Sequence, residues 1–462
     1  MGSLGYFVHR YHFYLACLGI SITGSCLAWS PPPSWRESLP PVAETRLAPL
    51  HRDRQLARDA ARPPGEPLQF AETRDVSVTP DNDGHWQLLA GGTRVWRYRL
   101  RVPGATDLSL GFTRFQLTEG ARLYLFDTVE GQRQGPFTAL DNQPHEQFWP
   151  PMLGGETVTL ELSLPAGAAM PTLRLGRIGA GYRDLLRRGP QPRQGACNID
   201  VVCPEAALWQ DTSRSVAALT FGGFRFCSGT LINDVPASGR GFFLTAHHCG
   251  IDDRNASSVT LYWNFHSPVC GQLGGGLSGA DVQVGGARVR ASRADVDMTL
   301  LELNTLPDPA WGVVHAGWDR SGQAPLGSVA IHHPGGDEKA ISFNDDRLTV
   351  RGNCIGVESP LDSHWRVDNW EQGTTEPGSS GSGLFEPVGQ RLVGFLSGGT
   401  AACGFRTGYD CYGRFSVAWD GPDAGSRLRD WLDPAGTGAV TVNPIRARGG
   451  NHPGFILRNG FE

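Results

Sequence analysis

The sequence predicts an all-β protein with two modules, a β-sandwich-like module followed by a barrel or double-barrel module. Short segments of alternating apolar and polar residues recur from residue 73 to about 433, separated by Gly, Pro and Asn turns, as in TRVWRYRLRV, ETVTLELSL and RLVGFLSG. Helical patterns are scarce, and only SRLRDWL at 426–432 is convincing. Of the 10 cysteines, all but Cys17 and Cys26 follow residue 195, so we expect two separate β modules of which only the second carries disulfides.

At 462 residues the chain is longer than one typical domain. We expect a signal peptide at 1–28, a proline- and arginine-rich linker at 29–72, a β-rich module at 73–193, the barrel module at 194–434 and an irregular tail at 435–462, ending in FILRNGFE.

The first segment is expected to be removed on secretion. Residues 13–30 are a short apolar stretch behind Arg10, followed by prolines, which favours a signal peptide over a membrane span. Lipidation at Cys26 is the alternative. The protein is therefore expected to be secreted, to the medium, the periplasm or the cell surface, where disulfides persist.

Composition excludes several function classes. The formal net charge is −5 and the pI is near 6.2, without basic runs, so neither nucleic acid nor a stable membrane association is expected. Lys339 is the only lysine, which we interpret as a GC-rich coding bias. No cofactor and no metal are expected, and the protein is expected to be a monomer.

Three short segments carry the chemistry, namely LTAHHCG at 244–250, VDMTLLEL at 296–303 and TEPGSSGS at 375–382. Acyl transfer by a serine requires an imidazole to take the hydroxyl proton and a carboxylate to fix the imidazole tautomer. We predict His248, Asp297 and Ser380 for these roles, in the chain order of chymotrypsin. The backbone N–H groups of Gly378 and Ser380 are predicted to form the oxyanion hole.

Each segment alone has an ordinary structural explanation, such as a packed His-His-Cys cluster, a strand-capping aspartate or a flexible glycine loop. Their joint occurrence in this order favours catalysis. The alternative is a catalytically silent homologue that binds peptide or cell wall. An esterase is disfavoured because the G-x-S-x-G elbow is absent around Ser380.

Residues 197 to about 433 resemble the lysyl endopeptidase family of secreted bacterial chymotrypsin-like proteases, through CNIDVVCPE, FLTAHHCG, LYWNF, AGWDR, AIHHP and YGRF besides the segments above. The resemblance implies a chymotrypsin-like double β-barrel, with His248 as base and His247 in a structural place. It implies cleavage after a basic residue of a protein or peptide. The β-rich module, which contains LGFTRFQLTEGARLYLFDT, resembles the propeptide of such precursors.

The resemblance also implies three disulfides, Cys197–Cys403, Cys203–Cys270 and Cys227–Cys249. Cys354 and Cys411 have no counterpart, and by elimination we expect them to pair with each other. A disulfide is typically worth roughly 2–4 kcal/mol.

For the specificity pocket, the resemblance points to Asp410 as the carboxylate that receives the basic side chain. A solvated turn aspartate is the alternative. Thr374, six residues before Ser380, holds the place of the trypsin-like pocket base and carries no charge. Ser397 replaces the pocket histidine of lysine-specific members, and no counterpart of their tryptophan is found between Leu348 and His364, so arginine is expected to be accepted besides lysine.

Maturation is expected to remove the β-rich module, which would assist folding and block the site until it is cut. The position before the nucleophile is Ser379, so the ion pair with a new amino terminus that activates some chymotrypsin-like enzymes is unavailable. The segment before Cys197 offers Arg188 and Arg193 for a cut. A permanent accessory module is the alternative.

Overall fold

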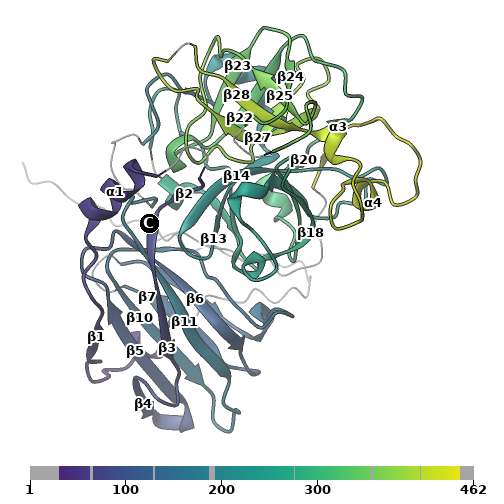
Figure 1. The fold of residues 1–462 in the computed structure, drawn as a ribbon. Helices are drawn as coiled ribbons and strands as arrows, with labels where there is room; N and C mark the ends of the chain where they lie inside the picture. Colours follow the sequence, from purple (N-terminus) through teal and green to yellow (C-terminus); the bar gives the residue numbers. More distant parts are fainter. Residues whose placement is uncertain are drawn as a thin grey trace, which may run out of the picture. The chain divides into compact units, whose positions relative to one another are not determined.

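The computed structural model describes residues 31–62, 66–127, 131–186, 193–274, 276–354, 358–405 and 407–447. The predicted signal peptide, Cys26, Arg188 and the FILRNGFE ending lie outside these ranges. Pro32 onward forms one compact unit. We describe it as an N-terminal module, residues 32–186, and a C-terminal module, residues 193–447 (Figure 1).

The N-terminal module is built from two β-sheets. In hydrogen-bonded order, the larger sheet is β1 (Glu44–Arg46), β5 (Arg94–Arg101), β10 (Thr157–Leu164), β7 (Arg122–Phe126) and β8 (Arg133–Phe137), with β4 (His85–Leu88) beside β5. The smaller sheet is β3 (Ala71–Val78), β11 (Thr172–Gly181), β6 (Asp107–Gln116) and β9 (Leu153–Gly154).

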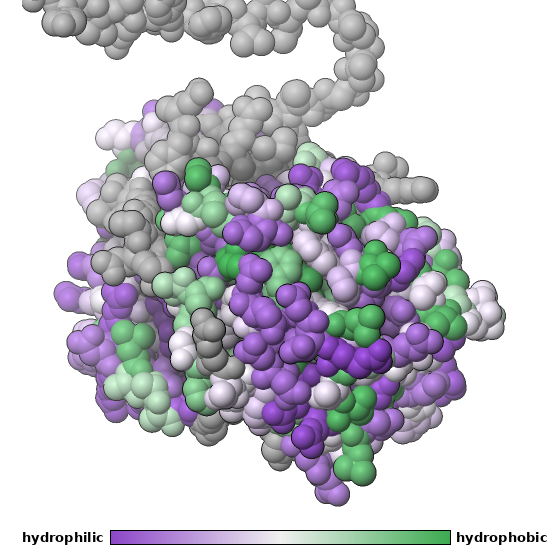
Figure 2. All heavy atoms as spheres, turned by 90° about the horizontal axis from the view of Figure 1, so that it is seen from above, coloured by the Kyte–Doolittle hydropathy of each residue, from purple (hydrophilic) through white to green (hydrophobic). Residues whose placement is uncertain are grey.

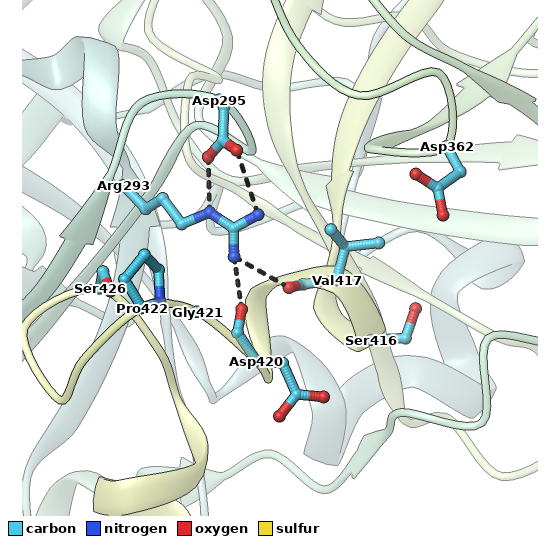
Figure 3. A pocket seen from close by; sticks show the side chains of 9 residues that line it. All are labelled: Arg293, Asp295, Asp362, Ser416, Val417, Asp420, Gly421, Pro422 and Ser426. Carbon is cyan, nitrogen blue, oxygen red and sulfur yellow. Dashed lines mark hydrogen bonds and ion pairs between the residues drawn. The ribbon is translucent and has the colours of Figure 1, made fainter.

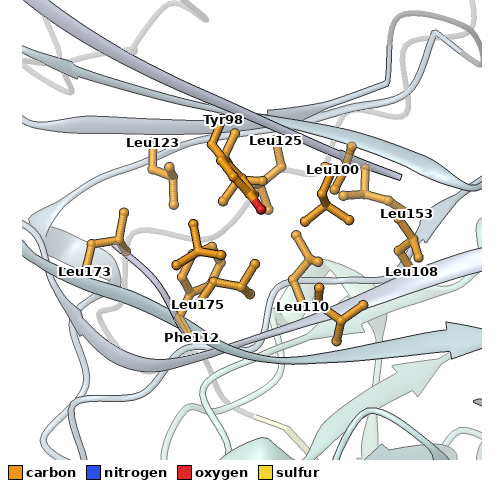
Figure 4. Close-up of a cluster of buried hydrophobic side chains, with 14 of the residues drawn as sticks. Tyr98, Leu100, Leu108, Leu110, Phe112, Leu123, Leu125, Leu153, Leu173 and Leu175 are labelled. Atoms are coloured by element: carbon orange, nitrogen blue, oxygen red, sulfur yellow. The ribbon is translucent and has the colours of Figure 1, made fainter. Parts of the chain in front are cut away.

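Leucine and aromatic side chains from both sheets meet in one core (Figure 4). Tyr98 and Leu100 of β5 stand two residues apart and therefore point to the same face, toward Leu110 of β6 and Leu175 of β11. Two sheets of mainly antiparallel strands that pack face to face around such a core form a β-sandwich, as the alternating segments predicted.

The C-terminal module also has two main sheets. The first is β17 (Asp281–Gln283), β16 (Thr260–Trp263), β13 (Val216–Phe221), β14 (Arg225–Leu231), β15 (Phe242–Ala246), β19 (Met298–Leu303) and β18 (Ala287–Arg293), with β2 (Leu68–Gln69) on β14. The second is β12 (Ile199–Asp200), β23 (Ala340–Asn344), β22 (Ser328–His332), β26 (Gly383–Phe385), β27 (Leu392–Gly399), β28 (Asp410–Arg414), β25 (His364–Val367) and β24 (Thr349–Arg351), joined by β21 (Trp318–Asp319) and β29 (Thr441–Val442).

The two sheets of the C-terminal module share a core. Leu244 of β15 and Leu300 of β19 belong to the same buried cluster as Ile331 of β22 and Phe395 of β27. Each sheet also has a core of its own, around Leu219 in the first and Trp365 in the second. The all-β prediction is confirmed.

The segment 29–72, predicted as a linker, differs from expectation because it contains β1, β2 and helix α1 (Arg52–Ala60). The helix is held by polar contacts: Tyr182 Oη donates to Asp59 Oδ2 at 2.9 Å, and Arg183 Nη2 donates to the same oxygen at 2.6 Å. Such contacts leave no apolar periodicity in the sequence, which is why the pattern suggested a linker.

The remaining α-helices of the described residues are α2 (Gln210–Ser213), α3 (Phe415–Ala418) and α4 (Arg429–Leu432), so the helix expected at 426–432 is one turn long. The tail, predicted as irregular, contributes β29 to β21 and β30 (Ile445–Arg446) to β20 (Val314–His315). Backbone pairing and side-chain contacts both place these short strands, since Val442 packs against a buried cluster and Arg446 pairs with Asp211.

Hydrophobic side chains on the face seen in Figure 2 are scattered among hydrophilic ones. Within the described ranges, no helix has the length and apolar character needed to cross a bilayer.

Candidate active site

His248 and Asp297 lie just beyond the ends of two paired strands. β15 and β19 run antiparallel, with Ala246 opposite Met298. His248 follows β15 in a short 3₁₀ turn, and Asp297 directly precedes β19. The pairing of the strands therefore places the imidazole beside the carboxylate.

Two hydrogen bonds join this pair. The backbone N–H of His248 donates to Asp297 Oδ1 at 2.8 Å, and His248 Nδ1 lies 2.8 Å from Asp297 Oδ2. Asp297 is 1% exposed and has a φ of 57°, which is uncommon for a residue other than glycine. The backbone of this turn is thus held in a left-handed conformation that aims both carboxylate oxygens at His248.

The other imidazole nitrogen, His248 Nε2, has no hydrogen-bond partner among the described residues. A carboxylate at Nδ1 favours the tautomer with its proton on Nδ1, so Nε2 keeps a free lone pair. The arrangement can therefore accept a proton at Nε2. His247, by contrast, is exposed, with Nδ1 2.8 Å from Ser292 Oγ.

Ser380 lies in a loop that is pinned to the first sheet. Ser228 of β14 donates its N–H to the carbonyl of Ser380 at 2.8 Å and its hydroxyl to the carbonyl of Gly378 at 2.9 Å. A Cβ on Gly381 would stand 2.2 Å from Thr245 Oγ1, so this glycine lets the loop approach β15 just before His248. The loop from the second sheet and the turn from the first sheet are thus brought together, with Ser380 itself 9% exposed.

The same loop leaves two backbone donors free. Ser379 N–H bonds to Glu376 O and Gly381 N–H to Leu396 O, whereas the N–H groups of Gly378 and Ser380 donate to none of the described residues. Gly378 has a φ of 103°, which a side chain would strain. Two unused donors beside a serine are what stabilisation of a carbonyl oxyanion requires.

His332 braces this loop from behind. Its Nδ1 lies 2.8 Å from Ser379 Oγ and its Nε2 3.1 Å from Ser342 Oγ, while Ser342 Oγ donates to the carbonyl of Thr374 at 2.8 Å. Complete burial lowers the pKa of His332 to about 3, so the ring is neutral at physiological pH. Ser379 is thus hydrogen-bonded to a neutral imidazole.

Asp410 lies at the start of β28, and its side chain is 1% exposed. Trp370 Nε1 and Thr375 Oγ1 each donate to its Oδ2 at 2.7 Å, and no described residue donates to Oδ1. Burial raises the pKa of Asp410 to about 6, although the two hydrogen bonds oppose this rise. A buried carboxylate with one oxygen unused is suited to a cationic ligand, and a freely solvated turn aspartate would not be buried in this way.

The other two predicted pocket residues, Thr374 and Ser397, are also buried. Thr374 is 3% exposed and donates to the carbonyl of Thr375 at 3.4 Å. Ser397 of β27 is 1% exposed, and its hydroxyl has no partner in the described part of the chain. The sequence did not indicate Trp370, because the expected tryptophan was placed between Leu348 and His364 and nothing around residue 370 marks it as a partner of Asp410.

Eight cysteines form four pairs, which are those expected: Cys197–Cys403, Cys203–Cys270, Cys227–Cys249 and Cys354–Cys411. The third joins β14 to the turn that carries His248, and the fourth attaches β28 next to Asp410. The third and fourth disulfides therefore brace the surroundings of His248 and Asp410.

His332 and His333 do not belong to a metal cluster, since the described residues gather no group of three or more His, Cys, Asp or Glu side chains suited to a metal ion. Both rings are fully buried, and burial lowers both pKa values.

A separate pocket lies beside the turn before Asp297 (Figure 3). It is lined by Arg293, Asp295, Asp362, Ser416, Val417, Asp420, Gly421, Pro422 and Ser426. Arg293 Nη1 donates to the carbonyl of Val417 at 3.2 Å, and its guanidinium pairs with Asp295. These contacts tie the turn before Asp297 to α3 and are structural.

Two family models match the chain. The model described as "Lysyl endopeptidase, C-terminal domain" matches residues 192–413, and the one described as "Lysyl endopeptidase N-terminal domain" matches residues 38–176. The lysyl endopeptidase of Pseudomonas aeruginosa is 31% identical over 389 residues, which cover 77% of this chain and 80% of that protein.

Solved structures give weaker matches. Kallikrein-related peptidase 10 is 17% identical with a TM-score of 0.31, over 45% of this chain and 92% of that chain. Neuropsin, a serine protease of mouse brain, is 16% identical with a TM-score of 0.32, over 47% of this chain and 94% of that chain. These scores are low, so the assignment of a family rests on the sequence matches.

Proposed function

Since the chain belongs to the lysyl endopeptidase family and is accordingly a serine endopeptidase, we propose that it cleaves peptide bonds after arginine and lysine by a Ser380–His248–Asp297 mechanism. The observation that carries the specificity is the buried Asp410 carboxylate. Membership of the family supports the enzyme class.

In the proposed mechanism, Ser380 Oγ attacks the scissile carbonyl while His248 Nε2 takes the hydroxyl proton. Asp297 stabilises the imidazolium through the 2.8 Å contact at Nδ1. The N–H groups of Gly378 and Ser380 bind the oxyanion of the tetrahedral intermediate. The imidazolium then protonates the leaving amine, and water hydrolyses the acyl-enzyme by the reverse sequence of proton transfers.

Asp410 binds the positive charge of the residue before the cut. Trp370 and Thr375 occupy its Oδ2, which leaves Oδ1 for a guanidinium or ammonium group. Ser397 brings a small buried hydroxyl, without a partner among the described residues, where lysine-specific relatives have a histidine. The smaller side chain and the unused hydroxyl support acceptance of the larger arginine besides lysine.

The chain is proposed to be a secreted precursor from which residues 29–193 are removed. Four disulfide pairs in the C-terminal module suit an oxidising compartment. Arg193 itself is an unfavourable place for the cut, because its side chain is 13% exposed and donates to Asp337 Oδ1 at 3.2 Å. Cleavage there would require this segment to leave its contacts first, so we propose that the first cut lies upstream, with Arg188 as the candidate.

The test is to express residues 29–462 under oxidising conditions, as wild type and as Ser380→Ala, and to assay peptides that carry Arg, Lys or Phe before a reporter amide. We expect cleavage after Arg and Lys by the wild type, little cleavage after Phe, and no cleavage or self-processing by Ser380→Ala.

A folded wild type with four disulfides that hydrolyses none of the three amides would contradict the proposal and support the silent peptide- or cell-wall-binding homologue. Equal hydrolysis after Phe and Arg would leave the enzyme class intact and remove the role assigned to Asp410.

A further inference from the structure

A short strand of the N-terminal module extends a sheet of the C-terminal module. β2 pairs antiparallel with β14, with Leu68 opposite Phe226 and Gln69 opposite Arg225. The pairing continues with a hydrogen bond from Phe70 N–H to the carbonyl of Phe224 at 2.9 Å. β14 pairs with β15 only at Thr230 and Leu231, so Arg225 and Phe226 form a local edge on the side that does not face β13. An extended segment added to such an edge is how many proteins bind peptides.

The edge that β2 occupies lies next to the candidate nucleophile. Cys227, the residue after Phe226, is bonded to Cys249, which follows His248. The next residue, Ser228, donates its N–H to the carbonyl of Ser380 at 2.8 Å. Because the pairing is antiparallel, Pro67 precedes Leu68 in the direction in which β14 continues from Phe226 to Cys227 and Ser228.

Leu68 also covers the loop that would form the oxyanion hole. Its Cδ2 is 3.4 Å from where a Cβ of Gly378 would stand and 2.9 Å from the corresponding point at Gly336. Leu68 is 6% exposed and belongs to a buried cluster with Phe226 and Phe265 of the C-terminal module. The strand is thus anchored by backbone pairing and by an apolar side chain.

We infer that Leu68–Phe70 occupies, in the precursor, the sheet edge that receives the leaving-group side of a peptide substrate, and so keeps the enzyme inactive until the N-terminal module departs. The inference rests on the proposed function. β2 runs in the same chain direction as such a substrate would, because the substrate residues after the cut would also run along β14 away from Ser380. Pro67, the residue before Leu68, has no N–H, so the bond between Glu66 and Pro67 is a tertiary amide. The segment therefore offers Ser380 no secondary amide at this bond.

The chain provides a matched pair of variants for the test. Leu68→Asp places a charge in the buried cluster, whereas Leu88→Asp makes the same change in β4, where Leu88 is 73% exposed. Each full-length precursor is exposed briefly to a fluorophosphonate probe, which phosphonylates an accessible serine nucleophile with loss of fluoride. Gel separation then gives the labelling rate of the intact chain and of the processed enzyme separately.

We expect slow labelling of the intact wild type and of Leu88→Asp, at least tenfold faster labelling of intact Leu68→Asp, and fast labelling of the processed enzyme in all three. Alkylation should find the same protected cysteines in each variant, which establishes folding. Should Leu68→Asp fail this check, Leu68→Ala takes its place, with a smaller expected rise.

An intact wild type that labels as fast as its processed form would overturn the inference, as would a folded Leu68→Asp or Leu68→Ala that labels as slowly as wild type. Failure of the processed enzyme to label would instead contradict the proposed function.

Discussion

Trp370 donates its indole N–H to Asp410 Oδ2 at 2.7 Å; Trp370 lies in the loop after β25, Asp410 begins β28, and both residues are buried. A hydrogen bond to a carboxylate favours its charged form, while burial favours the neutral form. The pKa of Asp410 is raised to about 6 as the balance of these effects. The tryptophan therefore helps to keep the proposed pocket acid ionised at neutral pH.

Removal of this donor should raise the pKa of Asp410 further. We expect Trp370→Phe to reduce kcat/KM for an Arg peptide at pH 7 by about tenfold, in the range for loss of a hydrogen bond to a charged group, and to spare most of the activity at pH 9. Trp431→Phe, which removes an indole donor to the carbonyl of Ala424, is the matched control and should behave as wild type. Equal effects of the two variants at both pH values would exclude this role.

The raised pKa of Asp410 predicts a specificity that depends on pH. In the free enzyme the carboxylate is protonated below about pH 6 and ionised above it, so the attraction for a cationic side chain grows as pH rises through this value. The ratio of kcat/KM for an Arg peptide to that for a Phe peptide should therefore increase between pH 5 and about pH 7. Because both substrates use the same catalytic groups, the ratio cancels their titration. Asp410→Asn should make the ratio small and flat, and a flat wild-type ratio would contradict the assignment.

The sequence predicted the strands better than it predicted the contacts between individual side chains. Alternation along 156–164 indicated a strand, and β10 covers Thr157–Leu164. The order and spacing of His248, Asp297 and Ser380 suggested one site because each segment carries its own local signal. The structure adds the antiparallel register of β15 and β19, which places His248 beside Asp297.

Contacts made by single side chains across long separations could not be read in this way. Trp370 and Asp410 are far apart in the sequence, and nothing in either segment marks the pair. Helix α1 was missed for a similar reason, since Asp59 is held by Tyr182 and Arg183 rather than by an apolar stripe. Hydrophobic periodicity indicates which face of a helix or strand is buried, but it does not indicate which polar side chains contact each other.

Two adjacent histidines allow a direct test of the proposed base. His248→Ala should lower kcat/KM by at least about 10³-fold, because the proton acceptor is lost. His247→Ala removes an exposed ring whose hydrogen-bond partner is Ser292, and it should keep kcat/KM within about threefold of wild type. A hydrolysis assay on an Arg peptide checks both, with circular dichroism as the control for folding. A larger fall in kcat/KM for His247→Ala than for His248→Ala would assign the role of base to His247.

The hydroxyl of Ser379 connects the loop of Ser380 to the buried ring of His332, with Oγ 2.8 Å from Nδ1. Its Oγ also accepts the N–H of Glu376 at 3.2 Å, so it spans the turn from which Gly378 and Ser380 direct their N–H groups. In Ser379→Ala this turn loses both contacts, and the oxyanion donors should be less well placed. We expect kcat to fall by about 10- to 100-fold with KM nearly unchanged, since the oxyanion exists only beyond the ground state.

Ser382→Ala is the matched control, because the hydroxyl of Ser382 has no partner among the described residues, and its kcat should stay near that of wild type. A rise in KM alone for Ser379→Ala would mean that the hydroxyl shapes the pocket and leaves the oxyanion hole unaffected.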